Sequence, residues 1–221
     1  MSYPAAPWNL QGYAVQTVHL IDVDCVRDLI PSEFEIFSIL PGKTIGGVYL
    51  SNYQSGSVLE YSELIVVPGL VSYQGKIGGW VSHIYVDNPD SVAGGREIWG
   101  LPKELANFTW ELDKRVVVQQ GNKTLCSLDY NQQSLFSWRQ WFGWSSYSTK
   151  NADVLSFPFE FEFNLGFIGS KLEVPVGSPF AGLKLGNPFL TARCDRLTLH
   201  IDAPKIVGVK GGKERPVPQY L

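Results

Sequence analysis

Short runs in which apolar and polar residues alternate dominate the chain, and this two-residue period is typical of β-strands. The first run covers residues 13–22, where Val and Thr also favour a strand. Residues 24–29 are expected to form a short helix, with Asp24 as its N-cap and Pro31 just beyond its end. The pattern therefore predicts a strand that leads directly into a short helix.

Further strand candidates follow with only short turns between them, an arrangement that favours antiparallel neighbours. They cover residues 33–40, 44–53, 59–73, 77–87, 107–112, 115–120, 124–130, 170–176 and 196–209. Gly121 and Asn122 predict a tight turn between two of these strands. Residues 211–221 contain Gly and Pro and have few means of burying themselves.

Two segments of the second half are rich in aromatic residues. Every second residue from 157 to 163 is Phe, which predicts a strand with one aromatic and one solvated face. Residues 138–144 contain Trp138, Trp141, Phe142 and Trp144. This second segment is interpreted either as a short helix under a barrel end or as a wall of a ligand cavity, and packing is the more common role of such residues.

Many short strands and few helical periods predict a mainly β fold, and such a set usually closes or stacks to avoid open edges. The pattern alone does not distinguish a barrel from a sandwich. With 221 residues, the chain is expected to form a single domain over residues 1–221.

Composition narrows the classes of function. The net charge of -3 comes from 18 basic and 21 acidic residues that are scattered along the chain, so no nucleic-acid partner is expected. The start of the chain has no basic region before a long apolar run, and no segment reaches the roughly 18 apolar residues of a membrane span. We therefore expect no membrane span and a cytoplasmic protein.

The cysteines and histidines are widely spaced. Three cysteines (Cys25, Cys126 and Cys194) do not suggest a disulfide framework and are expected to be reduced core residues. The histidines (His19, His83 and His200) fall on different predicted strands without the close spacing of metal ligands, so no metal site is expected.

Residues 94–106 combine flexible backbone, charge and a lone lysine. Gly94, Gly95 and Gly100 allow unusual backbone angles and Pro102 restricts the chain, so a shaped loop is expected to hold Lys103. Nearby apolar side chains would remove water from the ammonium group and favour the neutral amine, a nucleophile for carbonyl carbon. The alternative is that Lys103 begins a surface helix and points into water.

Glu63 is the candidate for proton transfer. It shares a strand face with Tyr61, Ile65 and Val67, because residues two apart lie on the same side. A partly desolvated carboxyl group suits proton transfer. The alternative is a glutamate that bonds to backbone at the rim of a barrel.

The sequence Gly95-Arg96-Glu97, followed by Gly100-Leu101-Pro102-Lys103, resembles the active-site segment of the acetoacetate decarboxylase superfamily. The resemblance extends over most of residues 10–112 through Asp24-Cys25-Val26-Arg27, Tyr61-Ser62-Glu63 and Tyr85-Val86-Asp87-Asn88. It implies a closed, cone-shaped antiparallel β-barrel with a few short helices, assembled as a homo-oligomer.

The same resemblance implies the chemistry. Lys103 would form a Schiff base with a small carbonyl substrate, Glu63 would be the active-site glutamate, and no metal or organic cofactor would be needed, since the iminium is the electron sink. The expected reaction is that of a lyase, by decarboxylation or aldol-type chemistry. Candidate substrate-binding residues are Arg96, Tyr61, Tyr85, Trp99 and Leu101.

A second resemblance is to the plant neoxanthin-deficient proteins, a branch of the same superfamily. It is carried by Ala6-Pro7-Trp8, Gly46-Gly47, Glu63-Leu64-Ile65-Val66 and Leu197-Thr198-Leu199. This branch implies the alternative function, a barrel that binds an apolar isoprenoid such as a carotenoid, with Lys103 vestigial or structural.

Three positions depart from the decarboxylase pattern. Glu104 replaces the family's second lysine, Gly12 stands near the position of its arginine, and Val48 stands near that of its other acidic residue. Arg96 could replace the missing arginine as an anion clamp, because a guanidinium holds carboxylates bidentately. The alternative for Arg96 is a salt bridge to Glu97 or to a neighbour that fixes the loop.

Overall fold

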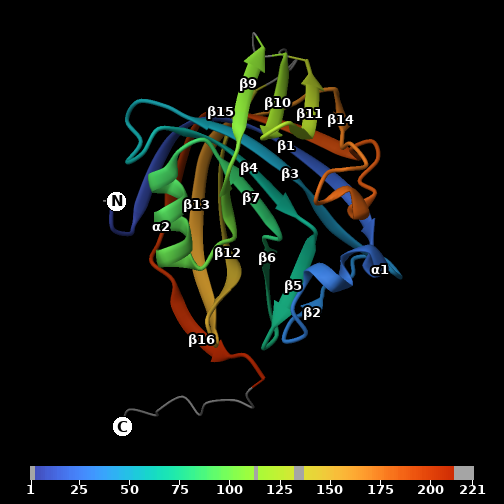
Figure 1. Ribbon diagram of the computed structural model, residues 1–221, viewed down its shortest axis with the longest axis vertical. Coiled ribbons are helices and arrows are strands. Elements are labelled where there is room, and N and C mark those ends of the chain that lie inside the picture. Colours follow the sequence, from blue (N-terminus) through green and yellow to red (C-terminus); the bar gives the residue numbers. More distant parts are fainter. Residues whose placement is uncertain (1–2, 112–113, 132–136, 212–221) are drawn as a thin grey trace.

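A computed structural model describes residues 3–111, 114–131 and 137–211 of the chain, and its strands form two sheets (Figure 1). The larger sheet contains β1 (Trp8–Asp22), β2 (Glu35–Ile36), β3 (Lys43–Tyr53), β4 (Tyr61–Val67), β5 (Gly69–Tyr73), β6 (Lys76–Trp80), β7 (His83–Val86), β8 (Lys103–Leu105), β12 (Trp138–Lys150), β13 (Asp153–Phe167), β15 (Leu190–Ile201) and β16 (Lys205–Val209). The smaller sheet contains β9 (Asn107–Glu111), β10 (Arg115–Gln120), β11 (Lys123–Tyr130) and β14 (Ser170–Glu173). The helices are α1 (Val23–Val26) and α2 (Pro89–Trp99), with short 3-10 turns η1 (Arg27–Leu29) and η2 (Ala181–Leu183). The prediction of a mainly β fold is confirmed.

Several predicted strands are interrupted where proline removes a backbone N–H donor. The run 59–73 divides into β4 and β5 at Pro68, and the run 196–209 divides into β15 and β16 before Lys205, next to Pro204. Of the run 33–40, only β2 pairs with another strand, β5. Residue 112 and the tail 212–221 lie outside the described residues.

The first helix begins earlier than expected. Asp24 lies inside α1, and Asp22 occupies the N-cap position without a side-chain capping bond. The Asp22 carboxylate instead pairs with Lys43 Nζ at 2.7 Å, across the β1–β3 ladder. The prediction of Asp24 as N-cap is therefore wrong, because the acidic residue before it occupies that position.

Residues 138–144 belong to a strand, so the helical interpretation of this segment is wrong. β12 pairs with β13 along its whole length, with Trp144 opposite Phe159 and Phe142 opposite Phe161. Phe142 and Trp144 of β12 can therefore face the same side of the sheet as their partners Phe161 and Phe159 of β13.

The resemblance implied an antiparallel sheet, but the larger sheet also contains parallel pairs. Its strand order is β2-β5-β6-β12-β13-β15-β1-β3-β4-β7-β8, with β16 beside β13, and the pairs β6/β12 and β7/β8 are parallel. Between β7 and β8 the chain crosses through α2, which returns it to run in the same direction. The path has two end strands, β2 and β8, so complete closure into a cone stays an expectation of the resemblance.

Strands β3 and β4 are buried on both faces, and this explains their near-continuous apolar sequence. One face packs against the smaller sheet in a single core. The residues of the smaller sheet in this core include Val116, Val118, Leu125 and Leu128. Val48, Leu50, Leu64 and Val66 supply the β3 and β4 side of this core. The opposite face of the two strands is turned toward a cavity, described below. The smaller sheet thus covers the outside of the strands that carry the candidate chemistry.

The cysteines are free thiols, and Cys126 and Cys194 are buried while Cys25 is half-buried. None of the helices in the described part of the chain has the length and apolar character needed to cross a bilayer.

Candidate active site

Helix α2, rather than the expected loop, precedes the candidate lysine. Asn88 caps its start, because the Asn88 side chain accepts hydrogen bonds from the backbone N–H groups of Asp90 and Ser91 at 2.9 and 3.2 Å. Pro89 fits the first helical turn, where no N–H donor is required. Gly100 ends the helix in the left-handed conformation, with φ of 64°. The chain then turns back, and Lys103 begins β8.

Lys103 points into the protein, so the alternative of a solvated lysine is wrong. Its Nζ lies 2.8 Å from Glu63 Oε1, and the two side chains are only 4% and 5% exposed. The Nζ also donates to Ser91 Oγ at 2.9 Å. The pairing of β4 with β7, and of β7 with β8, brings the two groups together across the sheet.

Tyrosines surround this buried pair. Tyr53 donates its hydroxyl to Glu63 Oε2 at 3.2 Å, and the hydroxyls of Tyr49 and Tyr53 lie 3.2 Å apart. Lys103 Nζ lies 5.0 Å from the centre of the Tyr61 ring. Burial raises the pKa of Tyr53 and of Tyr61 well above the ordinary value. Both phenols therefore keep their protons at neutral pH, and Tyr53 remains a donor to Glu63.

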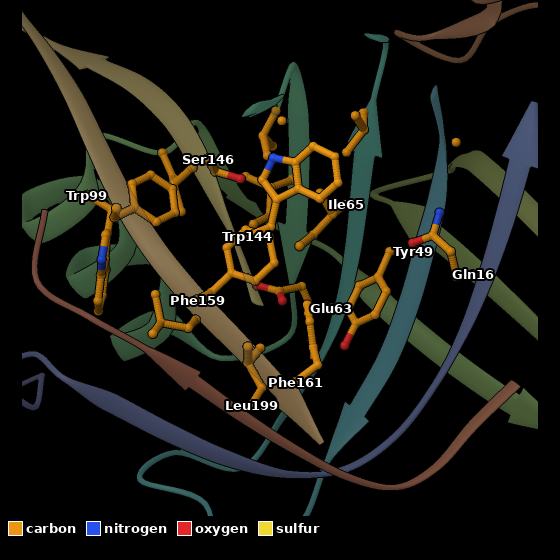
Figure 2. Close-up of a pocket in the computed structure, with 18 of the residues that line it drawn as sticks. Gln16, Tyr49, Glu63, Ile65, Trp99, Trp144, Ser146, Phe159, Phe161 and Leu199 are labelled. Carbon is orange, nitrogen blue, oxygen red and sulfur yellow. The ribbon is translucent and has the colours of Figure 1, made fainter. Parts of the chain in front are cut away.

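The pair opens onto a cavity of about 380 Å³. Its aliphatic and glycine lining is Val18, Ile45, Gly46, Gly47, Ile65, Val67, Leu70, Gly79, Val81, Ile84, Leu101, Leu199 and Ile201; its aromatic lining is Trp8, Tyr49, Tyr53, Trp99, Phe142, Trp144, Phe157, Phe159 and Phe161; and its remaining lining is Gln16, Ser146, Glu63 and Lys103. Figure 2 shows Glu63 in the middle of this space, with Trp144, Phe159, Phe161 and Tyr49 around it. The wall formed by β12 and β13 fits the second interpretation of the aromatic segment at 138–144.

The predicted substrate-binding residues lie in different places. Trp99 and Leu101 line the cavity. Tyr61 is buried against Lys103. Tyr85 belongs to the core shared with the smaller sheet, and burial raises its pKa to about 12. Arg96 donates from Nε to the backbone oxygen of Lys103 at 2.7 Å, so it fixes the lysine segment by a hydrogen bond to backbone, whereas Glu97 pairs with Lys150.

Glu104 is turned away from the lysine. It is exposed, and its Oε2 accepts a hydrogen bond from Gln120 Nε2 at 2.7 Å. Neighbouring residues on a strand point to opposite faces, so the β8 backbone separates this carboxylate from the cavity. The replacement of the family's second lysine therefore leaves Glu63 as the acidic partner that contacts Lys103.

Two residues of the site were not identified from the sequence: Ser91 and Tyr53. Ser91 follows the Asn-Pro-Asp start of α2, a helix signal that would have placed it. Tyr49 and Tyr53 lie four apart on β3, and so on one face, a pattern that was available. A Cβ on Gly95 would lie 2.8 Å from Lys103 Cε, so this glycine makes room for the lysine stem.

Within the described ranges, no group of three or more His, Cys, Asp or Glu side chains is arranged to hold a metal ion. His19 lies in the protein interior, where Nδ1 contacts Leu185 O at 2.7 Å and Nε2 contacts Thr17 Oγ1 at 3.0 Å. Burial lowers the pKa of His19 and of His83. Both histidines therefore favour the neutral form.

Known proteins resemble this chain in sequence and in fold. Protein NEOXANTHIN-DEFICIENT 1 of Arabidopsis thaliana is 30% identical over 107 residues, which are 48% of this chain and 38% of that protein. An acetoacetate decarboxylase of Paraburkholderia phytofirmans is 36% identical over 116 residues, which are 48% of this chain and 40% of that protein. The chain thus spans less than half the length of these relatives in the matched segments.

The fold is shared over nearly the whole chain. The crystal structure of acetoacetate decarboxylase from Legionella pneumophila superposes with a TM-score of 0.77 at 16% sequence identity, covering 96% of this chain and 91% of that one. The family model described as acetoacetate decarboxylase (ADC) matches residues 1–146, well over half of the sequence. The chain therefore belongs to the acetoacetate decarboxylase family.

Proposed function

We propose that the protein is a Schiff-base-forming lyase that acts on a small oxo acid or ketone through Lys103. The observation that carries this proposal is the contact of 2.8 Å between Lys103 Nζ and Glu63 Oε1 at the wall of an apolar cavity. A proton can pass from the ammonium to the carboxylate along this contact. The transfer leaves a carboxylic acid and a neutral amine, the form of lysine that is a nucleophile.

The neutral amine can then attack the carbonyl carbon of the substrate. The carbinolamine hydroxyl takes one proton, which the Glu63 carboxylic acid can supply, and leaves as water, so that a protonated imine remains. In a 3-oxo acid the C–CO2 bond breaks next, CO2 leaves, and the electron pair moves through the enamine to the imine nitrogen. The enamine carbon takes up one proton, and water hydrolyses the imine to release the ketone and the free amine. The net reaction consumes one proton for each CO2.

Glu63 is placed to handle that proton. After giving its first proton to the departing water, the Glu63 carboxylate can take up a proton from solvent and deliver it to the enamine carbon. Ser91 accepts a hydrogen bond from Lys103, and Tyr53 donates one to Glu63, so each partner is also held by a neutral group. These contacts support a fixed geometry in which the amine faces the carbonyl carbon of the substrate and the carboxyl group faces the neighbouring carbon.

The test is trapping of the imine. Borohydride added with small 2-oxo and 3-oxo acids should reduce an imine at Lys103 to a stable secondary amine, located by peptide mass. The Lys103→Met variant should give no adduct, whereas Lys150→Met, which removes an exposed lysine paired with Glu97, should be trapped like the parent. No adduct at Lys103 with any carbonyl compound would overturn the proposal.

A second function, binding of an apolar isoprenoid such as a carotenoid, is favoured by the aromatic wall of the cavity and by the NEOXANTHIN-DEFICIENT 1 relatives. The volume of about 380 Å³ argues against it. Ligand pockets span roughly 300–1,000 Å³, and this cavity lies near the small end of that range. A protein that stays colourless after incubation with xanthophylls in detergent would exclude the binding function.

Further properties that the family implies belong to the same proposal. They are a single domain over residues 1–221, a closed cone-shaped barrel, homo-oligomeric assembly, a cytoplasmic location and catalysis without a metal or organic cofactor. Light scattering coupled to size-exclusion chromatography measures the assembly directly.

A further inference from the structure

We infer that the substrate carries an uncharged apolar tail: a 3-oxo acid extended by an alkyl or aryl group, rather than acetoacetate itself. This inference rests on the proposed function, because it assumes that the carbonyl end lies at Lys103. It concerns the rest of the cavity, which the Schiff-base chemistry does not require.

The charged side chains that line the cavity pair with each other. Among the described lining residues, Lys103 and Glu63 alone carry charge, and they contact each other. The Gln16 amide also lines the cavity, but its Nε2 already donates to the backbone oxygen of Thr17 at 2.7 Å. A second charge on the substrate tail would lose its hydration without a partner of opposite sign, and this is costly.

The cavity extends well beyond the reacting pair. Glu63, Ile65 and Val67 follow one another on the inner face of β4, and all three line it. At about 3.4 Å per residue, the four steps from Glu63 to Val67 span roughly 14 Å. On the neighbouring strand, Tyr49 lies opposite Ile65 and Gly47 lies opposite Val67, and both also line the cavity. Such a length exceeds what the reacting end of a short oxo acid fills.

An aromatic wall stands on the other side of this space. Trp144 of β12 and Phe159 of β13 are direct partners in the ladder, and both line the cavity. Figure 2 shows the side chains of Trp144, Phe159 and Phe161 in the same space as Glu63. Aromatic and branched side chains facing each other across the space favour a flat or extended apolar group between them.

The experiment compares chain lengths. Substrates are acetoacetate, its homologues with two and with four added methylenes, and a dicarboxylic 3-oxo acid whose tail ends in a second carboxylate. Readouts are CO2 release and borohydride trapping at Lys103. We expect kcat/KM to rise by about fourfold for each added methylene, the factor given by burying one CH2 group. The dicarboxylic acid should fall below acetoacetate.

Two variants test the wall itself. Trp144→Ala and Phe159→Ala should flatten the rise with chain length, and Trp141→Ala, at a position 64% exposed, should leave the rise unchanged. Having two wall variants keeps the test decisive if one of them fails to fold.

The outcomes separate this inference from the function on which it rests. A flat or falling series, a dicarboxylic acid used as well as its apolar counterpart, or wall variants that keep the parent's rise overturns the apolar tail while Lys103 trapping stands. Absence of trapping with every substrate overturns the Schiff-base function instead, and the inference with it.

Discussion

An ammonium group and a carboxylate that are almost fully enclosed lose their hydration, and local partners must replace it. For Lys103 these partners are Glu63 and Ser91, and for Glu63 they are Lys103 and Tyr53. Removing one charge leaves the other desolvated without its counterion. The stability of this region therefore depends on the pair as a unit, whatever it contributes to catalysis.

We predict that Glu63→Gln lowers the free energy of unfolding by about 3–5 kcal/mol, the cost of breaking a buried pair by removing one partner. The double variant Lys103→Met/Glu63→Leu should recover most of this loss, because apolar residues of similar volume need no counterion. Urea unfolding followed by circular dichroism measures both.

Asp22→Asn provides the matched control for this prediction. Its pair with Lys43 is at a comparable distance of 2.7 Å but is largely exposed, so we expect a change of only about 0–1 kcal/mol. A loss for Glu63→Gln as small as that of the control would contradict the account of the buried pair.

Lys103 and Glu63 could be named from the sequence because each stands in a short pattern with a chemical reason. Sequence patterns could place Ser91 in the first turn of a helix and Tyr53 on one strand face with Tyr49, but only the fold shows that their hydroxyls converge on the pair. Arg96 shows the opposite limit: its charge suggested an anion clamp, but its contact to the Lys103 backbone depends on how α2 meets β8. Whether Arg96 also meets a substrate stays a prediction.

Among the elements, helix α2 positions Lys103 most directly. Gly95 lies on the side of α2 that meets the lysine stem, and a Cβ there would lie 2.8 Å from Lys103 Cε. A methyl group at this place would displace either the helix or the lysine. The distance between Lys103 Nζ and Glu63 is therefore set partly by the absence of a side chain at Gly95.

We predict that Gly95→Ala slows trapping of the imine at Lys103 by at least tenfold, as a misplacement on the order of 1 Å can cost more than that. Helix propensity alone predicts the opposite for stability, since Ala favours an interior helical position by about 1 kcal/mol over Gly. Trapping reactions that are stopped at successive times and analysed by peptide mass give the rate. A rate like that of the parent would show that the lysine is not held by this contact.

Gly182→Ala serves as the control for the substitution itself. It lies in η2, and a Cβ there meets nothing within 4 Å. We expect the trapping rate of this variant to equal that of the parent.

Helix α2 also shows why some elements escape sequence analysis. Its glycine pair lowers helix propensity, and its buried face consists of Ser91, Gly94, Gly95 and Trp99, so the sequence shows no apolar stripe with a 3.6-residue period. Asn88 and Pro89 are a signal for the start of a helix, but the glycines that follow them favoured the prediction of a loop. Strand breaks at proline, as at Pro68, follow from a missing N–H and are predictable in principle, whereas the extent of β12 required its partner β13.

In the molecule as a whole, buried thiols and phenols keep their protons in the folded state, and this makes the folded state less stable as the pH becomes alkaline. Burial raises the pKa of the thiols of Cys126 and Cys194 from 9.0 to about 12. Burial also raises the pKa of Tyr53 and Tyr61 well above 10.0. In the unfolded chain these groups ionise at their ordinary values, so between pH 9 and 12 the unfolded state binds fewer protons than the folded state.

We predict that stability is fully present below pH 9 and falls as pH rises from 9 toward 12, by about 1.4 kcal/mol per pH unit for each such group. Urea unfolding at pH 8 and at pH 10.5 checks the sign. Cys126→Ala should be less stable at pH 8, because it leaves a small cavity, but should lose less stability between the two pH values. A decline identical to that of the parent would show that this thiol does not contribute.

The mainly β character could be predicted because alternation is local, but the two parallel pairs could not. Strands β6 and β12 meet although more than fifty residues separate them, and no short pattern encodes that contact. The direction of β8 depends on the crossover through α2. Long-range pairing of this kind is fixed by the burial of the whole sheet.

The residues proposed to react and several of those that line the rest of the cavity come from different parts of the chain. The reacting pair, its tyrosines and Ser91 come from residues 49–103, within the segment that the family model matches, whereas Phe157, Phe159, Phe161, Leu199 and Ile201 lie beyond it. Substitutions in β13 and β15 can thus reshape what the cavity accepts without touching the atoms that react. In evolutionary terms, such a chain can exchange substrates while keeping its reaction, and β13 is where engineering for a new substrate should begin.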